Sequence, residues 1–438
     1  MRAKRTGRGL SKVFIGASGL IVLIVAAVIS AVVLFDKNSD NHEQSSENNY
    51  KPLLIQEEFD TNPVEEEHQE SEDLQIPDEG NTEEEETLVE DTSPEETLLS
   101  EMSLHDKICQ MMLVAPETLT GVETATAASQ TTQNAMMDYP VGGVILFAKN
   151  LQDRNQTVSM ISNFQKYAKE YNGIGLFISV DEEGGRVARI AQKLGTTKLN
   201  PMYEYREQGT GVAYDNAVTL AKSLSQFGFN LDFAPVADIW SNSQNKVIGD
   251  RAYSDNCEKT AELVSSAVEG FHSENIMCTL KHFPGHGDTA EDSHTGSAYV
   301  YKTLGELRNN ELLPFRAGIG AGADMVMAGH ITVPEVDSLP ASLSAVMITD
   351  ILRGELAYDG VVITDSLSME ALTGYYGSDK IAVMAVQAGN DLLLCQSGMK
   401  DMVRALENAV ASGEITQERI DESVRRILKL KYKYGLLE

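Results

Sequence analysis

Residues 361–366 read VVITDS, an apolar run that ends at a carboxylate and a hydroxyl. Three other stretches have the same form: LFISVDEEGGR at 176–186, MCTLKHFPGHGD at 277–288 and MVMAGH at 325–330. A short apolar run bounded by polar residues is typical of a buried strand. Ionisable or polar side chains follow each of these four strands directly. In a barrel of parallel strands this is the position of an active site.

Apolar runs of this kind recur eight times after residue 97, and most are separated by stretches long enough for a helix. Buried strands that alternate with helices predict a parallel sheet, and eight of them predict an α/β fold of the (β/α)8 TIM-barrel type. An open doubly wound sheet is the alternative, but no GxGxxG follows the first strand. The expected strands are Met111–Val114, Gly143–Phe147, Leu176–Val180, Leu231–Pro235, Met277–Leu280, Met325–Ala328, Val361–Thr364 and Asp391–Leu394. The clearest expected helices are Asp215–Phe227, Glu258–Glu274, Lys380–Ala388 and Thr416–Tyr432.

The N-terminus carries a candidate membrane anchor. Residues 13–35 contain no charged side chain, and residues 1–12 contain five basic ones. At about 1.5 Å per residue, a helix of this length crosses the hydrocarbon core of a bilayer. The basic flank predicts a single-pass protein of the cell membrane with a cytoplasmic N-terminus and an extracellular catalytic domain. A cleaved signal peptide is the alternative, but its apolar segment is shorter and ends at a small-x-small site.

Residues 36–96 form an expected disordered linker, because they contain 23 acidic residues against two basic ones. Such a composition buries too little apolar surface to offset the entropy of ordering the chain. The remaining domain, residues 97–438, is expected to hold the barrel. The net charge of the whole chain is −31, which argues against nucleic acid as a partner because phosphate binding depends on Lys and Arg. The four cysteines show no CxxC or finger spacing, so a structural zinc site has no support. We expect no metal and no cofactor.

The polar strand ends resemble glycoside hydrolase family 3, in its β-N-acetylglucosaminidase (β-N-acetylhexosaminidase) branch. The resemblance runs from about Leu99 to the C-terminus and is carried by residues 181–189 (DEEGGRVAR), 232–238 (DFAPVAD), 248–251 (IGDR), 281–294 (KHFPGHGDTAEDSH) and 363–366 (ITDS). Glu182 stands where the family usually has Gln, and we expect this change to be tolerated, although it adds a second carboxylate near the sugar.

The resemblance implies a role for each matching residue. Asp365 corresponds to the catalytic nucleophile of a retaining mechanism, and His294 with Asp292 to an acid/base dyad. A histidine suits the latter role because imidazole gives and takes a proton near neutrality. The implied sugar-binding residues are Asp181, Arg189, Arg251, Lys281 and His282. Taken alone, Asp181 or Asp365 could instead cap a helix, and His330 could be a hydrogen-bonded core histidine.

The predicted activity is hydrolysis of a terminal, non-reducing N-acetylglucosamine. One Trp and 6% aromatic residues provide few platforms for a long polysaccharide, so exo action on a single sugar is expected, with cell-wall muropeptides as the glycan and a monomeric enzyme. Three other hypotheses for the function stay open: a phosphorylase of the same family, a metal-dependent barrel hydrolase and a non-catalytic sugar-binding module of the cell wall.

Overall fold

The computed structural model describes residues 93–290 and 296–437, within a compact unit from Thr87 to Glu438. Eight parallel strands pair in chain order, each with the next. They are β1 (Met112–Val114), β2 (Gly143–Ile145), β3 (Phe177–Val180), β6 (Leu231–Asp232), β7 (Met277–Phe283), β9 (Met325–Ala328), β11 (Val361–Thr364) and β12 (Leu393–Cys395). A parallel bridge between Ile363 and Leu392 joins the last two strands and closes the ring. The predicted parallel α/β barrel is therefore confirmed, with each of its eight strands at the expected place.

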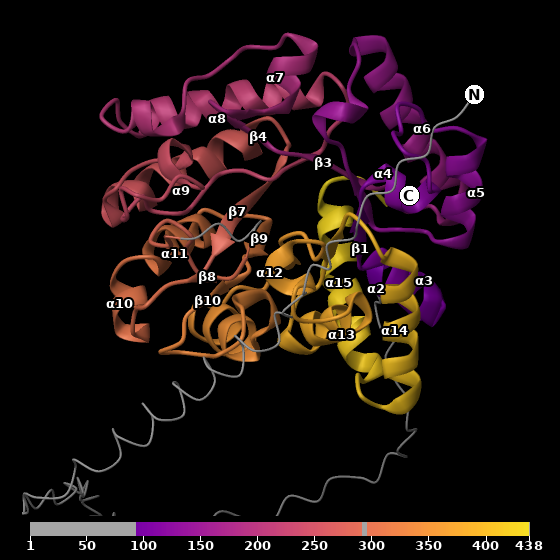
Figure 1. Ribbon diagram of the computed structural model, residues 1–438. Helices are drawn as coiled ribbons and strands as arrows, with labels where there is room; N and C mark the ends of the chain where they lie inside the picture. The colour runs from indigo at the N-terminus through magenta and orange to yellow at the C-terminus, as the bar shows by residue number, and fades with distance from the viewer. Residues whose placement is uncertain (1–92, 291–295, 438) are drawn as a thin grey trace, which may run out of the picture. The chain divides into compact units, whose positions relative to one another are not determined.

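Helices surround the strands on the outside of the barrel (Figure 1). The α-helices are α2 (Pro94–Glu101), α3 (Leu104–Gln110), α4 (Pro116–Thr120), α5 (Gln130–Asp138), α6 (Arg154–Asn172), α7 (Arg189–Leu194), α8 (Thr210–Ser225), α9 (Cys257–Ser273), α10 (Leu304–Asn309), α11 (Leu312–Gly320), α12 (Glu370–Thr373), α13 (Ser378–Ala388), α14 (Met399–Ser412) and α15 (Gln417–Lys433). Short 3-10 turns are η1 (Ala148–Asn150), η2 (Met202–Tyr205), η3 (Gly249–Arg251) and η4 (Ala341–Leu343), and η5 (Val346–Glu355) is a π-helix. Two small ladders pair β4 (Glu182–Gly184) with β5 (Val187–Ala188), and β8 (Ala298–Tyr299) with β10 (Ile331–Thr332).

Side-chain caps fix where two of these helices begin. The Ser103 hydroxyl accepts a hydrogen bond from the Asp106 amide at 3.1 Å, and the Thr416 hydroxyl accepts one from the Arg419 amide at 3.1 Å. Ile415 and Ile420 flank the second cap and are both buried, as a hydrophobic staple requires. Each cap satisfies an amide that has no partner in the helix, a contribution of about 1 kcal/mol.

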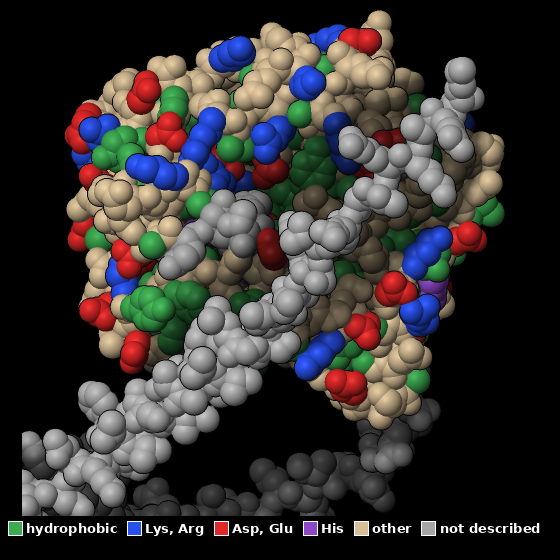
Figure 2. All heavy atoms as spheres, viewed as in Figure 1, with side chains coloured by type: hydrophobic (Ala, Val, Ile, Leu, Met, Phe, Trp, Pro, Cys, Tyr) green, Lys and Arg blue, Asp and Glu red, His purple; other side chains and the backbone are tan. Residues whose placement is uncertain are grey.

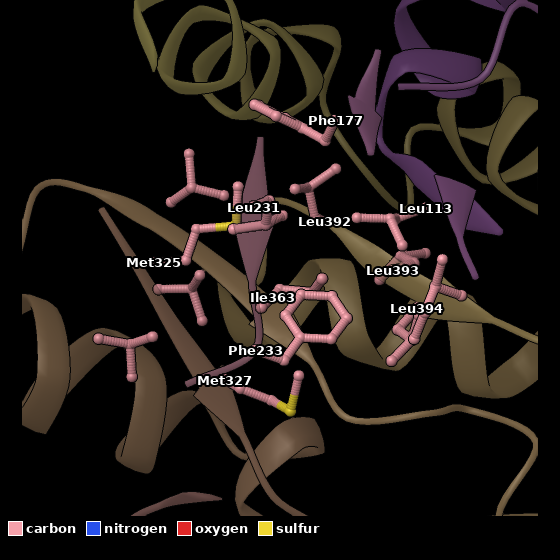
Figure 3. Packing of buried hydrophobic residues seen from close by; sticks show 14 of the residues in the cluster. Leu113, Phe177, Leu231, Phe233, Met325, Met327, Ile363, Leu392, Leu393 and Leu394 are labelled. Atoms are coloured by element: carbon pink, nitrogen blue, oxygen red, sulfur yellow. The ribbon is translucent and has the colours of Figure 1, made fainter. Parts of the chain in front are cut away.

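The barrel interior is filled by apolar side chains from the strands. Figure 3 shows Phe233, Met327 and Ile363 pointing toward one another in the middle of this core, and all three are buried. Burial of such a side chain contributes about 1.5–3 kcal/mol. Phe233 and Met327 also line the cavity at the barrel mouth, so the top layer of the core is the floor of that cavity.

The first described helix lies before the expected domain boundary. Helix α2 begins at Pro94 and packs against α15, where Glu96 forms an ion pair with Arg425. A boundary at residue 97 therefore falls inside α2. The expected anchor at 13–35 and nearly all of the linker at 36–96 lie outside the described residues. Within residues 93–290 and 296–437, no helix is long and apolar enough to cross a membrane.

Candidate active site

A cavity of about 250 Å³ lies at the carboxyl ends of the barrel strands. Six of the eight predicted site residues line it: Asp181, Arg189, Arg251, Lys281, His282 and Asp365. They come from the ends of β3, β7 and β11, from the start of α7 and from η3. Figure 2 shows acidic, basic and hydrophobic side chains gathered around a hollow near the centre of one face of the molecule.

Among the described lining residues the charges balance, with three carboxylates (Asp181, Glu183, Asp365) against three cations (Arg189, Arg251, Lys281). Such a site favours a neutral ligand rich in hydrogen-bonding groups over a strongly charged one.

Lys281 is held between two carboxylates. Its Nζ lies 2.8 Å from Asp181 Oδ1 and 2.6 Å from Glu183 Oε1. Burial opposes the charged form of Lys281, but the two carboxylates outweigh it and raise the pKa of the ammonium. The pairing of β7 with β9 shifts register between Leu280 and Phe283. An irregularity of this kind re-aims side chains, and both Lys281 and His282 face the cavity.

Glu183 connects Lys281 to Arg251. Arg251 Nε and Nη2 each lie 2.8 Å from a different oxygen of Glu183, a bidentate pair. The Glu183 side chain is only 3% exposed. Burial alone would raise its pKa, but Arg251 and Lys281 hold that pKa well below the ordinary value. The carboxylate therefore stays ionised and fixes two cations at the cavity wall.

Glu183 was not among the predicted site residues. The expectation that the Glu182 carboxylate lies near the sugar was wrong. Glu182 does not line the cavity; its carboxylate accepts hydrogen bonds from the amides of Ile190 at 2.6 Å and Ala191 at 3.0 Å, at the start of α7. Residues two apart on an extended segment point to the same side. Asp181 and Glu183 therefore share the cavity side, and Glu182 faces away. Burial raises the pKa of Glu182 to about 7, against these amide hydrogen bonds.

His282 is oriented by Asp238, a second residue absent from the predicted set. The His282 Nδ1 atom lies 2.7 Å from Asp238 Oδ2, and the other oxygen of Asp238 accepts from the amides of His282 and His286. Asp238 is fully buried, and the facing His282 ring lowers its pKa despite that burial. With Nδ1 occupied, Nε2 is the ring nitrogen of His282 left for a ligand in the cavity. Asp238 ends the DFAPVAD string, which is the signal that pointed to it.

Asp365 is positioned by backbone hydrogen bonds at the end of β11. Its amide donates to the Ala328 carbonyl at 2.8 Å, and its Oδ1 accepts from the Ser366 amide at 2.6 Å. His330 stabilises this turn through a hydrogen bond to its backbone. Its Nε2 donates to the Ser366 carbonyl at 2.9 Å, and Nδ1 lies 2.8 Å from the Ser342 hydroxyl. His330 is buried and does not line the cavity, so it is a positioning residue.

The loop after β7 is built on close backbone contacts. His286 is buried, and its Nδ1 lies 2.8 Å from the Thr289 hydroxyl. A Cβ atom at Gly287 would come within 1.7 Å of the Ile239 carbonyl oxygen, so only glycine fits there. Burial, together with the nearby His282 ring, lowers the pKa of His286. The two remaining predicted residues, Asp292 and His294, lie outside the described residues.

One group in the described part of the chain has the residue types of a metal site: His272, Cys278 and Asp324. His272 lies near the end of α9, Cys278 at the start of β7 and Asp324 just before β9, and none of the three lines the cavity. A single ring nitrogen of His272 approaches both Asp324 Oδ2 (2.8 Å) and Cys278 Sγ (3.8 Å). Asp324 also accepts from Lys433 at 2.8 Å and from the Tyr434 hydroxyl at 3.0 Å. The group is a hydrogen-bonded cluster, and a metal would have to displace these contacts.

Residues 103–430 match the glycosyl hydrolase family 3 N-terminal domain. The chain belongs to glycosyl hydrolase family 3. It is similar to β-hexosaminidase A from Pseudoalteromonas piscicida, with 34% identity over 67% of this chain and 54% of that protein. It is also similar to β-hexosaminidase from Xylella fastidiosa (strain M23), with 34% identity over 70% of this chain and 95% of that protein.

The fold of the family is found among solved structures. A glycoside hydrolase family 3 β-N-acetylglucosaminidase from Paenibacillus sp. str. FPU-7 aligns with a TM-score of 0.72 and 39% identity, over 76% of this chain and 63% of that one. This chain thus spans about half of the Pseudoalteromonas protein but nearly all of the Xylella one. The predicted resemblance to the β-N-acetylhexosaminidases of family 3 is confirmed, and so is the prediction that the protein is a glycoside hydrolase.

Proposed function

We propose that this family 3 glycoside hydrolase is a retaining, exo-acting β-N-acetylhexosaminidase that removes a terminal, non-reducing N-acetylglucosamine. The observation that carries the proposal is the meeting of six predicted residues in one cavity of about 250 Å³. Pockets for drug-sized ligands usually measure about 300–1,000 Å³, so this one suits a single sugar ring. The cavity has a nucleophile candidate, three cations and a fixed histidine around a charge-balanced centre.

In the proposed mechanism, Asp365 attacks the anomeric carbon and forms a glycosyl-enzyme intermediate. His294, oriented by Asp292, protonates the departing oxygen and then activates water for the second step. Retaining glycosidases need these two functions on opposite faces of the sugar. Lys281, Asp181 and His282 bind sugar hydroxyls, and the fixed network around Glu183 supplies them already oriented. Preorganised charges of this kind stabilise the transition state without reorganising during the reaction.

Hydrolysis of chromogenic β-glycosides tests the proposal. We expect turnover of p-nitrophenyl N-acetyl-β-glucosaminide and little or none of the β-glucoside, with release of N-acetylglucosamine. The same assay with added inorganic phosphate separates hydrolysis from phosphorolysis. Formation of a sugar 1-phosphate would show that the enzyme is a phosphorylase and not a hydrolase. No turnover of either glycoside would reject the proposed activity.

We further propose that the enzyme is anchored by residues 13–35, that its catalytic domain is extracellular and monomeric, and that it acts on cell-wall muropeptides. The support is the basic flank at 1–12, the uncharged run that follows it and the acidic linker at 36–96. A fragment of residues 87–438, which keeps α2 intact, is expected to be soluble and active, whereas the full chain is expected to fractionate with membranes. An insoluble fragment beside a full chain that is active in detergent would reject the independent domain.

A further inference from the structure

A second hollow, here called the outer groove, opens beside the cavity. It measures about 590 Å³ and is lined by the 366–374 segment after β11 and by Gln396 after β12. Three of its lining residues, Ser366, Met369 and Gln396, also line the cavity. The two spaces are therefore neighbours, and a ligand that fills the cavity has the outer groove as an adjacent site.

Ser366 lines both spaces and directly follows Asp365, the proposed nucleophile. Gly374 also lines the groove, and it precedes Tyr375, a residue that is 67% exposed and is not itself among the lining residues. The Ser297 hydroxyl donates a hydrogen bond to the Tyr375 hydroxyl at 3.1 Å. Tyr375 thereby joins the loop after β11 to the long segment that follows β7. When a sugar is bound over Asp365, its leaving group lies next to the outer groove.

Apart from Met369, the side chains that line the outer groove in the described part of the chain are polar, and they carry one formal charge. Hydroxyls and an amide come from Ser368, Thr373 and Gln396, and the only charged lining residue in the described part of the chain is Glu370. Glu370 is exposed, and no hydrogen bond or ion pair of its side chain with another described residue is found. An anionic ligand would meet this carboxylate with no lining Lys or Arg to offset it, and like charges repel.

We propose that the outer groove is the aglycone subsite, and that it selects a neutral leaving sugar over one with a free carboxylate. The inference rests on the proposed β-N-acetylhexosaminidase activity and names the leaving-group side of the same site. Hydroxyl and amide groups of the groove bind the hydroxyls of the second sugar, and the Tyr375 ring packs against its apolar face. In muropeptides, an amide bond to the peptide removes the charge of the muramyl carboxyl. The leaving sugar then has no free carboxylate at this position, as the proposed subsite requires.

Two disaccharides, one neutral and one anionic, test this selectivity. The neutral one is N-acetylglucosaminyl-β-1,4-N-acetylglucosamine, and the anionic one carries N-acetylmuramic acid, with its free lactyl carboxylate, at the second position. We expect the wild type to have a higher kcat/KM for the neutral disaccharide. Glu370→Gln should shift the ratio toward the anionic substrate by about two- to fivefold, the range for one exposed charge. Added salt should shift the wild-type ratio in the same direction, because it screens the repulsion.

Variants of exposed residues away from both hollows are the controls. Glu335→Gln removes an exposed carboxylate, and Tyr432→Ala removes an exposed tyrosine on α15; both should keep the wild-type ratio. Tyr375→Ala should lower kcat/KM for both disaccharides by about three- to tenfold. Wild-type turnover of p-nitrophenyl N-acetyl-β-glucosaminide with no ratio change in Glu370→Gln would overturn the subsite. Absence of that turnover would instead overturn the proposed function.

Discussion

Lys281 Nζ lies 2.6 Å from a carboxylate oxygen of Glu183, and both side chains are almost fully buried. Together with Arg251 this pair forms a fixed wall of the cavity. Charges held in this way are already desolvated and oriented before a sugar arrives.

We predict that Glu183→Gln destabilises the fold as well as the site. Removal of one partner from a buried ion pair costs about 3–5 kcal/mol, because Lys281 and Arg251 lose the charge that compensates their burial. Urea denaturation at pH 7 measures the change in the free energy of unfolding. Glu335→Gln, at an exposed position, is the matched control and should unfold like the wild type. A loss no greater than in that control would contradict the role of Glu183.

The lowered pKa of Glu183 predicts the direction in which the stability of the fold changes with pH. The pKa of Glu183 is lowered in the folded protein from an ordinary value of 4.5. Its contribution to stability is therefore fully present above pH 4.5 and is lost as the pH falls toward the lower folded-state pKa. Melting temperatures between pH 3 and 7 should fall more steeply with acid in the wild type than in Glu183→Gln. Parallel curves for the two proteins would contradict this assignment.

Asp238→Asn tests whether the orientation of His282 by Asp238 contributes to activity. We expect kcat/KM to fall by about 10- to 100-fold, the equivalent of one charge-assisted hydrogen bond. If Asp238 acts through His282, the double variant Asp238→Asn/His282→Gln should lose little more activity than His282→Gln alone. Independent, multiplicative losses would show that Asp238 has another function.

Gly287→Ala should disrupt the loop after β7, because the new methyl group would overlap the Ile239 carbonyl. We expect a lower melting temperature and a loss of activity of at least about tenfold, as misplacement by 1 Å can cost about 100-fold. Gly211→Ala is the control, since a Cβ there meets no atom within 4 Å. Equal behaviour of the two variants would show that the loop tolerates the added group.

His294→Ala should lose activity in proportion to the need for a proton. Substrates with poor leaving groups, such as alkyl glycosides, should react about 10²–10⁴-fold more slowly, and dinitrophenyl glycosides should be affected little. His286→Ala is the comparison, because its ring is already engaged with Thr289. A uniform loss across leaving groups in His294→Ala, or a leaving-group dependence in His286→Ala, would move the acid/base role elsewhere.

The sequence predicted the barrel and most of the cavity for a physical reason. Apolar runs mark buried strands, and parallel strands bring their carboxyl ends together, so Asp181, Lys281 and Asp365 meet although they are far apart in the chain. The contacts that orient them were harder to predict. Whether Glu182 or Glu183 faces the cavity depends on the side to which each residue points, and the alternation from Asp181 onward could have decided it. The pairing of Asp238 with His282 depends on how the segment after β6 packs against β7, which no local pattern specifies.

The central claim is that Asp365 is the nucleophile of a retaining mechanism, and covalent trapping tests it most directly. The enzyme is incubated with a 5-fluoro N-acetylglucosaminyl fluoride, digested, and the peptides are analysed by mass spectrometry. The account predicts one glycosylated peptide with the sugar on Asp365, and no adduct in Asp365→Ala, whose turnover should be almost abolished while its fold is retained. No adduct together with strong inhibition by a thiazoline mimic would contradict it, because that result means that the acetamido oxygen of the substrate is the nucleophile.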